Sequence, residues 1–369
     1  MIRIRSGGPW PASRWARAAP AGISRIRPLL PVILAAGWGS AALAWRIAYS
    51  PEEPESPGRR IATSAVFFTV GGGLVLGSRC GLKRELKSVR AVAEAAQRVL
   101  LRPLPPRLDG LVVAARQLSA HPGATVGGDL YEAVATPYGV RVVIGDVRGH
   151  GLAGLGAVAA VLGSFREAAH DEPELGGVLR RLDRAIQRHL RERAREEHPA
   201  SGGPQPDCPA AEEFVTVLLL EIAADGGVLA LNCGHPWPYR LGRSPEPLAT
   251  AVPLPPLGLF PLPSELPVRR CAQLLPGQAL FLYTDGAADA RDATGGFFGL
   301  EAVLADAVLD PPVSPAAVIA TVHAQLLRHT GGRISDDAAL LVLRNDRSRV
   351  PAQSAETALR RTRPQPSNR

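Results

Sequence analysis

The sequence predicts an α+β sandwich that follows two hydrophobic N-terminal helices. Short runs rich in Val, Leu and aromatic residues have strand character, and pairs of helical patterns separate them. Strand hairpins separated by helix pairs favour an α+β sandwich over a parallel, doubly wound sheet. Two uncharged stretches near the N-terminus add the hydrophobic helices. A chain of 369 residues is long enough for both parts.

The predicted globular domain covers residues 104–345. Its strand patterns are bounded by Gly or Pro, and they cover residues 111–118, 138–147, 214–222, 227–233, 237–242, 278–285 and 338–344. Gly127-Gly128-Asp129 is expected at the start of a further strand. Helical patterns cover residues 152–170, 175–195, 300–308 and 316–330.

Residues 28–81 are predicted to contain two transmembrane helices, at about 28–46 and 61–78. Each uncharged run can just cross about 30 Å of hydrocarbon, and the short polar loop between them favours a helical hairpin. Arginines precede the first helix, and basic residues follow the second. The positive-inside rule therefore predicts a multi-pass protein of the plasma membrane, with its basic tail (1–27) and globular domain in the cytoplasm.

Residues 82–103 have helix-forming residues with apolar positions three to four apart, and prolines end the pattern. This helical linker is either a rigid spacer or a coiled coil that forms a homodimer. The C-terminal residues 346–369 are predicted to be a disordered basic tail.

The net charge of +8 does not indicate nucleic-acid binding. The first 27 residues carry six arginines and no acid, and the last 26 carry seven arginines and two acids. The excess charge therefore lies in the tails, and no zinc knuckle, basic helix or aromatic basic strand accompanies it. The four cysteines show neither metal-ligand spacing nor a dense disulfide pattern, which fits a reduced, cytosolic domain.

Acidic residues stand beside apolar strands at four places. Each has a glycine beside it or a loop before it, and they are Asp129, Asp146, Asp285 and the pair Asp336-Asp337. If the strands are neighbours, these carboxylates converge at one edge of a sheet. Like charges this close raise one another's pKa, and divalent cations relieve the repulsion.

The chemistry expected of such a cluster is metal-assisted hydrolysis. The cysteines and histidines lack zinc spacing, so oxygen-preferring Mg²⁺ or Mn²⁺ is expected. Two such ions about 3.5–4 Å apart activate a water and stabilise charge on a transferred phosphoryl group. The sequence contains no convincing Ser–His–Asp or Cys–His set that would supply a nucleophile instead.

Seven segments in order resemble one family. They are VGGDLYE (126–132), VIGDVRGHG (143–151), FVTVLLLEI (214–222), NCGHPWPYRL (232–241), PPLGL (255–259), LFLYTDGAADA (280–290) and SDDAALLVL (335–343). The chain resembles bacterial PPM (type 2C) serine/threonine phosphatases, in the branch of sporulation protein IIE and the sigma-factor-regulating phosphatases.

This resemblance implies a four-layer α-β-β-α sandwich with two Mn²⁺ or Mg²⁺ ions at one end. It implies Asp129, Asp146, the backbone carbonyl of Val147, Asp285 and Asp336 as metal ligands, with Asp337 as a secondary candidate. It also implies hydrolysis of phosphoserine or phosphothreonine on a regulatory protein of the anti-anti-sigma-factor type. Departures such as Leu130 and Glu132 remove none of these ligands.

Two other functions remain to be weighed. Residues 149–154 satisfy the GxGxxG pattern of dinucleotide-binding proteins, but that fold requires a second parallel strand after the first helix, where this sequence predicts another helix. A membrane-tethered scaffold with a vestigial metal site, which binds a regulatory protein without efficient catalysis, is the alternative from another class. The roles of His150, His235, Arg116 and Arg148 stay open, and Arg148 stands where the family commonly has a small residue.

Overall fold

The computed structural model describes residues 101–118, 127–148, 152–197, 213–248, 252–309 and 312–347, with short helical pieces between residues 37 and 100. The chain divides into two units, residues 1–88 and 89–369, and each is described by itself.

In the first unit, the described residues are helical pieces of the two predicted hydrophobic segments. A Cβ placed on Gly71 would lie 3.7 Å from Cδ1 of Trp38, so pieces of the two segments are neighbours at that point. None of the residues described belongs to a helix both long and apolar enough to cross a membrane. Most of the predicted spans at 28–46 and 61–78, and nearly all of both basic tails, lie outside the described residues.

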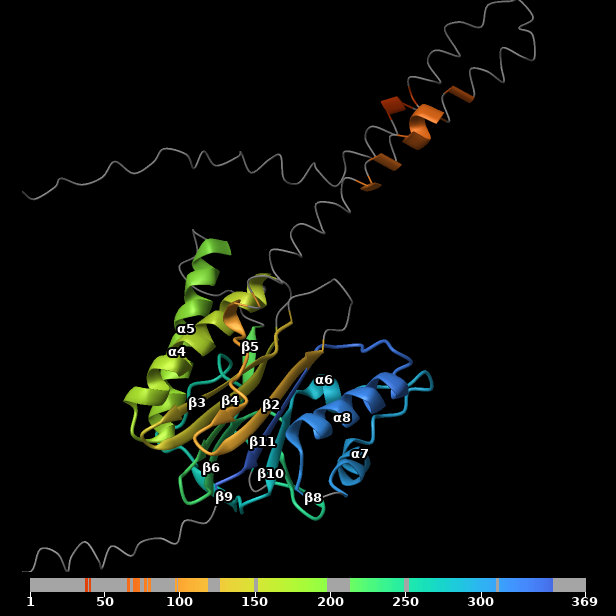
Figure 1. The fold of residues 1–369 in the computed structure, drawn as a ribbon. Helices are drawn as coiled ribbons and strands as arrows, with labels where there is room; N and C mark the ends of the chain where they lie inside the picture. Colours follow the sequence, from red (N-terminus) through yellow and green to blue (C-terminus); the bar gives the residue numbers. More distant parts are fainter. Residues whose placement is uncertain are drawn as a thin grey trace, which may run out of the picture. The chain divides into compact units, whose positions relative to one another are not determined.

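The second unit contains two antiparallel sheets packed face to face, each covered by helices on its outer side (Figure 1). In the described part of the chain, the five-stranded sheet has the order β3 (Leu130–Thr136), β4 (Gly139–Arg148), β5 (Phe214–Ile222), β6 (Gly227–Cys233) and β9 (Arg269–Gln273). The six-stranded sheet has the order β1 (Arg107–Leu108), β2 (Leu111–Leu118), β11 (Ala338–Asn345), β10 (Ala279–Tyr283), β7 (Tyr239–Leu241) and β8 (Pro245–Pro247).

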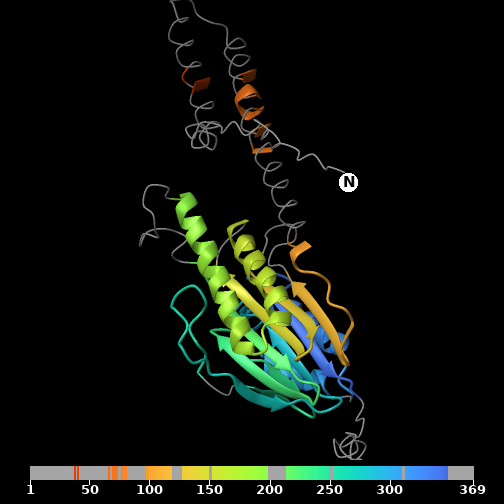
Figure 2. The ribbon, with the colours of Figure 1, turned by 90° about the vertical axis from the view of Figure 1, so that its left-hand side faces the viewer.

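Two pairs of helices form the outer layers. The helices α4 (Leu152–Asp171) and α5 (Leu175–Glu197) cover the five-stranded sheet (Figure 2), and α7 (Leu300–Ala307) and α8 (Pro315–His329) cover the six-stranded sheet. A short helix, α6 (Asp285–Ala288), follows β10. The predicted four-layer α-β-β-α sandwich is therefore confirmed.

Three apolar cores lie between the four layers, because side chains alternate along each strand. On β4, Val143 and Val147 pack against α4 and α5, whereas Val142 and Ile144 pack against the other sheet. A strand buried on both faces is apolar on both, and five of the eight residues 140–147 are Val or Ile.

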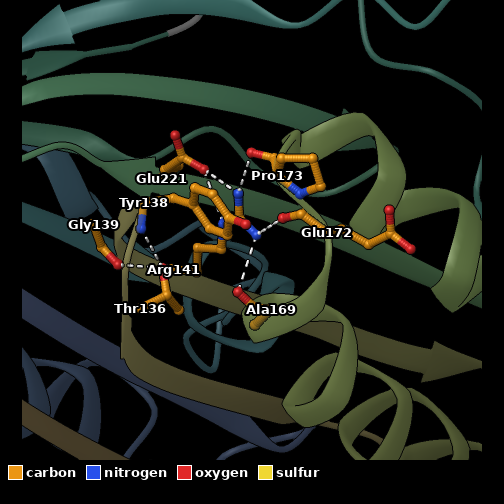
Figure 3. Close-up of polar contacts among 8 residues, drawn as sticks. All are labelled: Thr136, Tyr138, Gly139, Arg141, Ala169, Glu172, Pro173 and Glu221. Carbon is orange, nitrogen blue, oxygen red and sulfur yellow. Dashed lines mark hydrogen bonds and ion pairs between the residues drawn. The ribbon is translucent and has the colours of Figure 1, made fainter.

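A fully buried arginine anchors the turn between α4 and α5 to the five-stranded sheet (Figure 3). Arg141 donates to Oε2 of Glu221 from Nε (2.8 Å) and Nη2 (2.6 Å). It also donates to the backbone carbonyls of Ala169, Glu172 and Pro173, which end α4 and lead into α5. A helix end carries partial negative charge, so this cation both caps α4 and fixes it on the sheet.

The end of the predicted linker helix lies within the second unit and contacts α4. Gln97, Val99 and Leu100 are helical, and the N–H of Leu101 donates to the carbonyl of Gln97 (2.8 Å). Arg166 on α4 donates to the carbonyl of Leu100 (2.7 Å) and forms an ion pair with Glu132 (2.6 Å).

The sequence patterns missed four short elements: β1, β8, β9 and α6. The strand β9 is polar, with Arg269 and Arg270 exposed, because it lies at the edge of its sheet. The dinucleotide-binding alternative is wrong: α5 follows α4 directly, and β5 pairs antiparallel with β4.

Candidate active site

The acidic residues singled out in the sequence gather where the two sheets meet. Asp129 leads into β3 and Asp146 lies near the end of β4, which are paired at Leu130 and Gly145. Asp285 begins α6, two residues after β10 ends at Tyr283, and Asp336-Asp337 precede β11. The N–H of Thr284 donates to the carbonyl of Ala339 (3.1 Å), so these two strand ends are also adjacent.

Glycines let the backbone approach the carboxylates from both sheets. A Cβ on Gly127 would lie 2.2 Å from Oδ2 of Asp337, and a Cβ on Gly128 would lie 2.6 Å from Oδ1 of Asp146 and 2.3 Å from the carbonyl oxygen of Val147. No side chain fits at either position without a shift. Because Gly127 leads into the five-stranded sheet and Asp337 into the six-stranded one, the site is shared between the sheets.

The carboxylates stand close enough to perturb one another's ionisation. Burial raises the pKa of Asp129 well above its usual range, Asp146 adds to the rise, and a hydrogen bond with Thr284 opposes it. The pKa of Asp146 is raised to about 7, mainly by burial and then by the negative charges of Asp285 and Asp336. The pKa of Asp285, the most solvent-exposed of these three, is raised by burial and then by Asp336. The site is therefore short of positive charge.

A buried histidine links the two sheets beside this cluster. Nε2 of His235 lies 3.1 Å from the carbonyl oxygen of Tyr283, and Nδ1 lies 3.2 Å from Oγ1 of Thr216. A carbonyl only accepts, so Nε2 carries the proton. The hydroxyl of Thr216 in turn accepts from the N–H of Asp146 (3.3 Å).

The surroundings of His235 indicate a positioning role. Burial lowers its pKa to about 3, so the ring is neutral near pH 7 and holds the ends of β5 and β10 together. The side chain of Asn232 accepts from the backbone N–H of His235 and donates to the backbone carbonyl of His235, each at 2.8 Å. The sequence left the role of His235 open and did not indicate this link.

Thr284 is a second residue of the site that the sequence analysis did not assign. Its side chain is fully buried, hydrogen-bonds to Asp129, and accepts from the N–H of Ala339 (2.8 Å). It therefore ties β11 and β10 to a carboxylate of the other sheet. A hydroxyl directly before an expected ligand, in Thr284-Asp285, was the available signal.

The two arginines left open by the sequence lie in different places. Arg116 lies on the face of β2 that packs on α8. There the pKa of His323 is lowered by burial and, to a smaller extent, by the charge of Arg116. Arg148 ends β4, two residues after Asp146, and is exposed. His150 lies outside the described residues.

The donor set fits hard divalent cations. Oδ2 of Asp129 is buried and accepts no hydrogen bond from the residues described, so this oxygen is available as a ligand. The Val147 carbonyl and the Asp146 carboxylate meet at Gly128, and all these donors are oxygens, the ligands that Mg²⁺ and Mn²⁺ prefer. Among the described residues, no group of three His, Cys, Asp or Glu side chains is already arranged around an ion position.

Comparisons with known proteins agree with this architecture. The family model of Stage II sporulation protein E (SpoIIE) matches residues 136–346, more than half of the chain. The SiaA-PP2C domain of Pseudomonas aeruginosa is 19% identical, with a TM-score of 0.52 over 72% of this chain and 98% of that one, and it shares the fold.

Two other solved structures are more distant in shape. The RsbU and RsbW domains of Rv1364c from Mycobacterium tuberculosis are 22% identical, with a TM-score of 0.47 over 68% of each chain. The PP2C phosphatase domain of SpoIIE from Bacillus subtilis is 14% identical, with a TM-score of 0.48 over 63% of this chain and 62% of that one. On the family match and the shared fold, the chain belongs to the Stage II sporulation protein E family and is a PPM-type protein serine/threonine phosphatase.

Proposed function

We propose that this phosphatase removes phosphate from phosphoserine or phosphothreonine on a regulatory protein of the anti-anti-sigma-factor type, using two Mn²⁺ or Mg²⁺ ions. The observation that carries the proposal is the gathering of Asp129, Asp146, Asp285 and Asp336-Asp337 at the junction of the sheets, with raised pKa values where shifts occur. A cluster this acidic is stable in its ionised form only with bound cations.

The ligands proposed for the ions are the carboxylates of Asp129, Asp146, Asp285 and Asp336, and the carbonyl of Val147. Asp337, whose carboxylate lies against Gly127, is a further candidate. When bound, two such ions supply an activated water and neutralise charge on the phosphoryl group.

The chain's own contribution is to hold these oxygens in place. Thr284 fixes Asp129, and the Thr216–His235 link fixes the end of β4 relative to β10. The N–H of Asp337 donates to Oδ1 of Asp336 (2.8 Å), which orients that carboxylate. No protein nucleophile is required in this arrangement.

We also propose that the catalytic domain is anchored to the cytoplasmic face of the plasma membrane through residues 28–46 and 61–78. The uncharged runs and the basic residues that flank them support this location. A periplasm-dependent reporter enzyme fused after Arg344 should be inactive, and the full-length chain should sediment with membranes. An active reporter would contradict the orientation.

Hydrolysis of para-nitrophenyl phosphate by the purified full-length chain, with Mn²⁺, Mg²⁺ or EDTA, tests the catalytic proposal. Asp146→Asn and Asp285→Asn should each lose more than about 100-fold in turnover and in Mn²⁺ affinity measured by calorimetry. Asp306→Asn, an exposed site on α7, is the matched control and should behave as wild type. Wild-type turnover in both site variants would refute the proposed ligands.

A wild-type chain that binds Mn²⁺ but shows no metal-dependent turnover would favour the scaffold instead. If the chain is catalytic, phosphoproteins that accumulate in cells lacking it would identify its substrate.

A further inference from the structure

Arg148 places a positive charge at the rim of the carboxylate cluster. It ends β4, directly opposite Phe214 on β5, and its side chain leaves the same face of the strand as Asp146. Along a strand, residues two apart are roughly 7 Å apart, so an arginine here reaches whatever binds over Asp146. The residue is exposed, whereas Asp146 is partly buried.

The guanidinium of Arg148 leans away from the cluster and onto an aromatic ring. Its Cζ lies 5.4 Å from the ring centroid of Phe214, within the range of a cation–π contact. Phe214 is on β5, on the opposite side of β4 from β3 and Asp129. Among the described residues, no carboxylate lies within ion-pair distance of Arg148. Its charge is thus held in place and is not neutralised by the site.

A second positive feature lies at the same end of the domain. Along α5, Arg184, Arg188, Arg191 and Arg195 recur at intervals of three or four residues and are all exposed. The ion pair between Arg193 and Glu213, the residue before Phe214, fixes the C-terminal part of α5 beside the start of β5. The arginines of the C-terminal half of α5 therefore add positive charge to the outer helix layer near this end of the domain.

We infer that this active site selects phosphoproteins whose phosphorylated residue is flanked by acidic side chains, and that Arg148 is the specificity-determining residue that binds the nearest of those carboxylates. The inference rests on the proposed phosphatase function and names its substrate class. The planar guanidinium binds a carboxylate through two parallel hydrogen bonds, and stacking on Phe214 orients it beforehand. Phe214 is a positioning residue in this scheme.

The test compares two phosphothreonine peptides that differ only in their flanks, Asp in one and Ala in the other, with para-nitrophenyl phosphate as a substrate that has no flanks. The full-length wild-type chain with Mn²⁺ should prefer the acidic peptide by about fivefold in kcat/KM, mainly through KM. Arg148→Gln should abolish this preference and leave hydrolysis of para-nitrophenyl phosphate unchanged. Arg243→Gln, an exposed arginine at the far end of the sheet, should change neither.

Charge reversal and aromatic rescue sharpen the test. Arg148→Glu should lower kcat/KM for the acidic peptide by roughly tenfold and favour a peptide with Lys flanks. Phe214→Leu should weaken the acidic preference, and Phe214→Trp should restore it, because Trp is the strongest cation–π partner. High salt should reduce the preference of the wild type.

Equal wild-type kcat/KM values on the two peptides would overturn the inference. An equal fall in kcat/KM of Arg148→Gln on the peptides and on para-nitrophenyl phosphate would also overturn it, because it would indicate that Arg148 contacts the phosphoryl group itself. Failure of the proposed function has a different signature, because the wild type would then hydrolyse none of the substrates with Mn²⁺. If variants at Arg184, Arg188, Arg191 and Arg195 changed binding to anionic vesicles but not peptide selectivity, the helix arginines would belong to a membrane contact and would no longer support the inference.

Discussion

Replacing Arg141 by Met should destabilise the catalytic domain strongly without touching the active site. The guanidinium is fully buried and satisfies the Glu221 carboxylate as well as the carbonyls that end α4. Removing one partner of a buried ion pair costs about 3–5 kcal/mol, because the other charge is left uncompensated. Some of the freed carbonyls gain no new donor, at about 1 kcal/mol each.

The expected loss of unfolding free energy is therefore about 4 kcal/mol, or a fall of roughly 8–16 °C in Tm for a domain of this size. Thermal and urea unfolding of the full-length chain, followed by circular dichroism at fixed Mn²⁺, measures it. Arg243→Met, at an exposed position, should stay within about 0.5 kcal/mol of wild type.

A double variant separates the charge pair from simple packing. Arg141→Met combined with Glu221→Leu removes the orphaned carboxylate, so it should recover about 2 kcal/mol relative to Arg141→Met alone. A loss of less than about 1 kcal/mol in Arg141→Met would refute this role of Arg141. A loss in the double variant larger than the sum of the losses in the two single variants would refute it as well.

Three further predictions concern the site. Gly128→Ala should lower Mn²⁺ affinity by about 100-fold, because the added Cβ meets the Val147 carbonyl and Asp146. The control Gly163→Ala lies in open space on α4 and should stabilise that helix by up to about 1 kcal/mol. Equal Mn²⁺ affinities of the two variants in calorimetry would contradict the prediction. In EDTA, the free energy of unfolding should fall as the pH rises from about 4 to about 7. In this range folded Asp146, with a pKa of about 7, keeps its proton, whereas Asp in the unfolded chain has lost it. Urea titrations of Asp146→Asn should show a weaker dependence of the unfolding free energy on pH. His235 acts in the opposite sense, because its folded pKa of about 3 lies below the unfolded value. The wild type should therefore lose about 2 kcal/mol of unfolding free energy as the pH falls from about 7 to about 5, and His235→Gln should not show this loss. Parallel pH profiles of the two proteins would argue against a neutral, buried ring.

The layered fold could be predicted because burial leaves a periodic signal. Five of the eight residues 140–147 are Val or Ile because β4 is covered on both faces, and the two helices that follow it have a clear helical pattern. The edge strand β9 left no such signal, because water satisfies the outer side of a strand whose residues are mostly polar.

The positions of the candidate ligands could also be anticipated, from carboxylates at strand ends with adjacent glycines, and the structure brings them together. Their roles as ligands stay predictions. The supporting contacts were beyond the sequence, since Thr216 and His235 meet only through strand pairing and sheet packing. The buried ion pair of Arg141 was also beyond the sequence, because nothing local indicates that Glu221, 80 positions away, lies opposite it.

The strand order of the six-stranded sheet has a consequence for how the enzyme becomes active during synthesis. The strand made last, β11, does not join an edge but inserts between β2 and β10, and it brings Asp336 and Asp337 with it. Until it emerges from the ribosome, the sheet has a gap at its centre and the cluster lacks its final carboxylates. We therefore predict that a nascent chain gains phosphatase activity only once β11 has been made, and that a chain terminated before Asp336 is inactive.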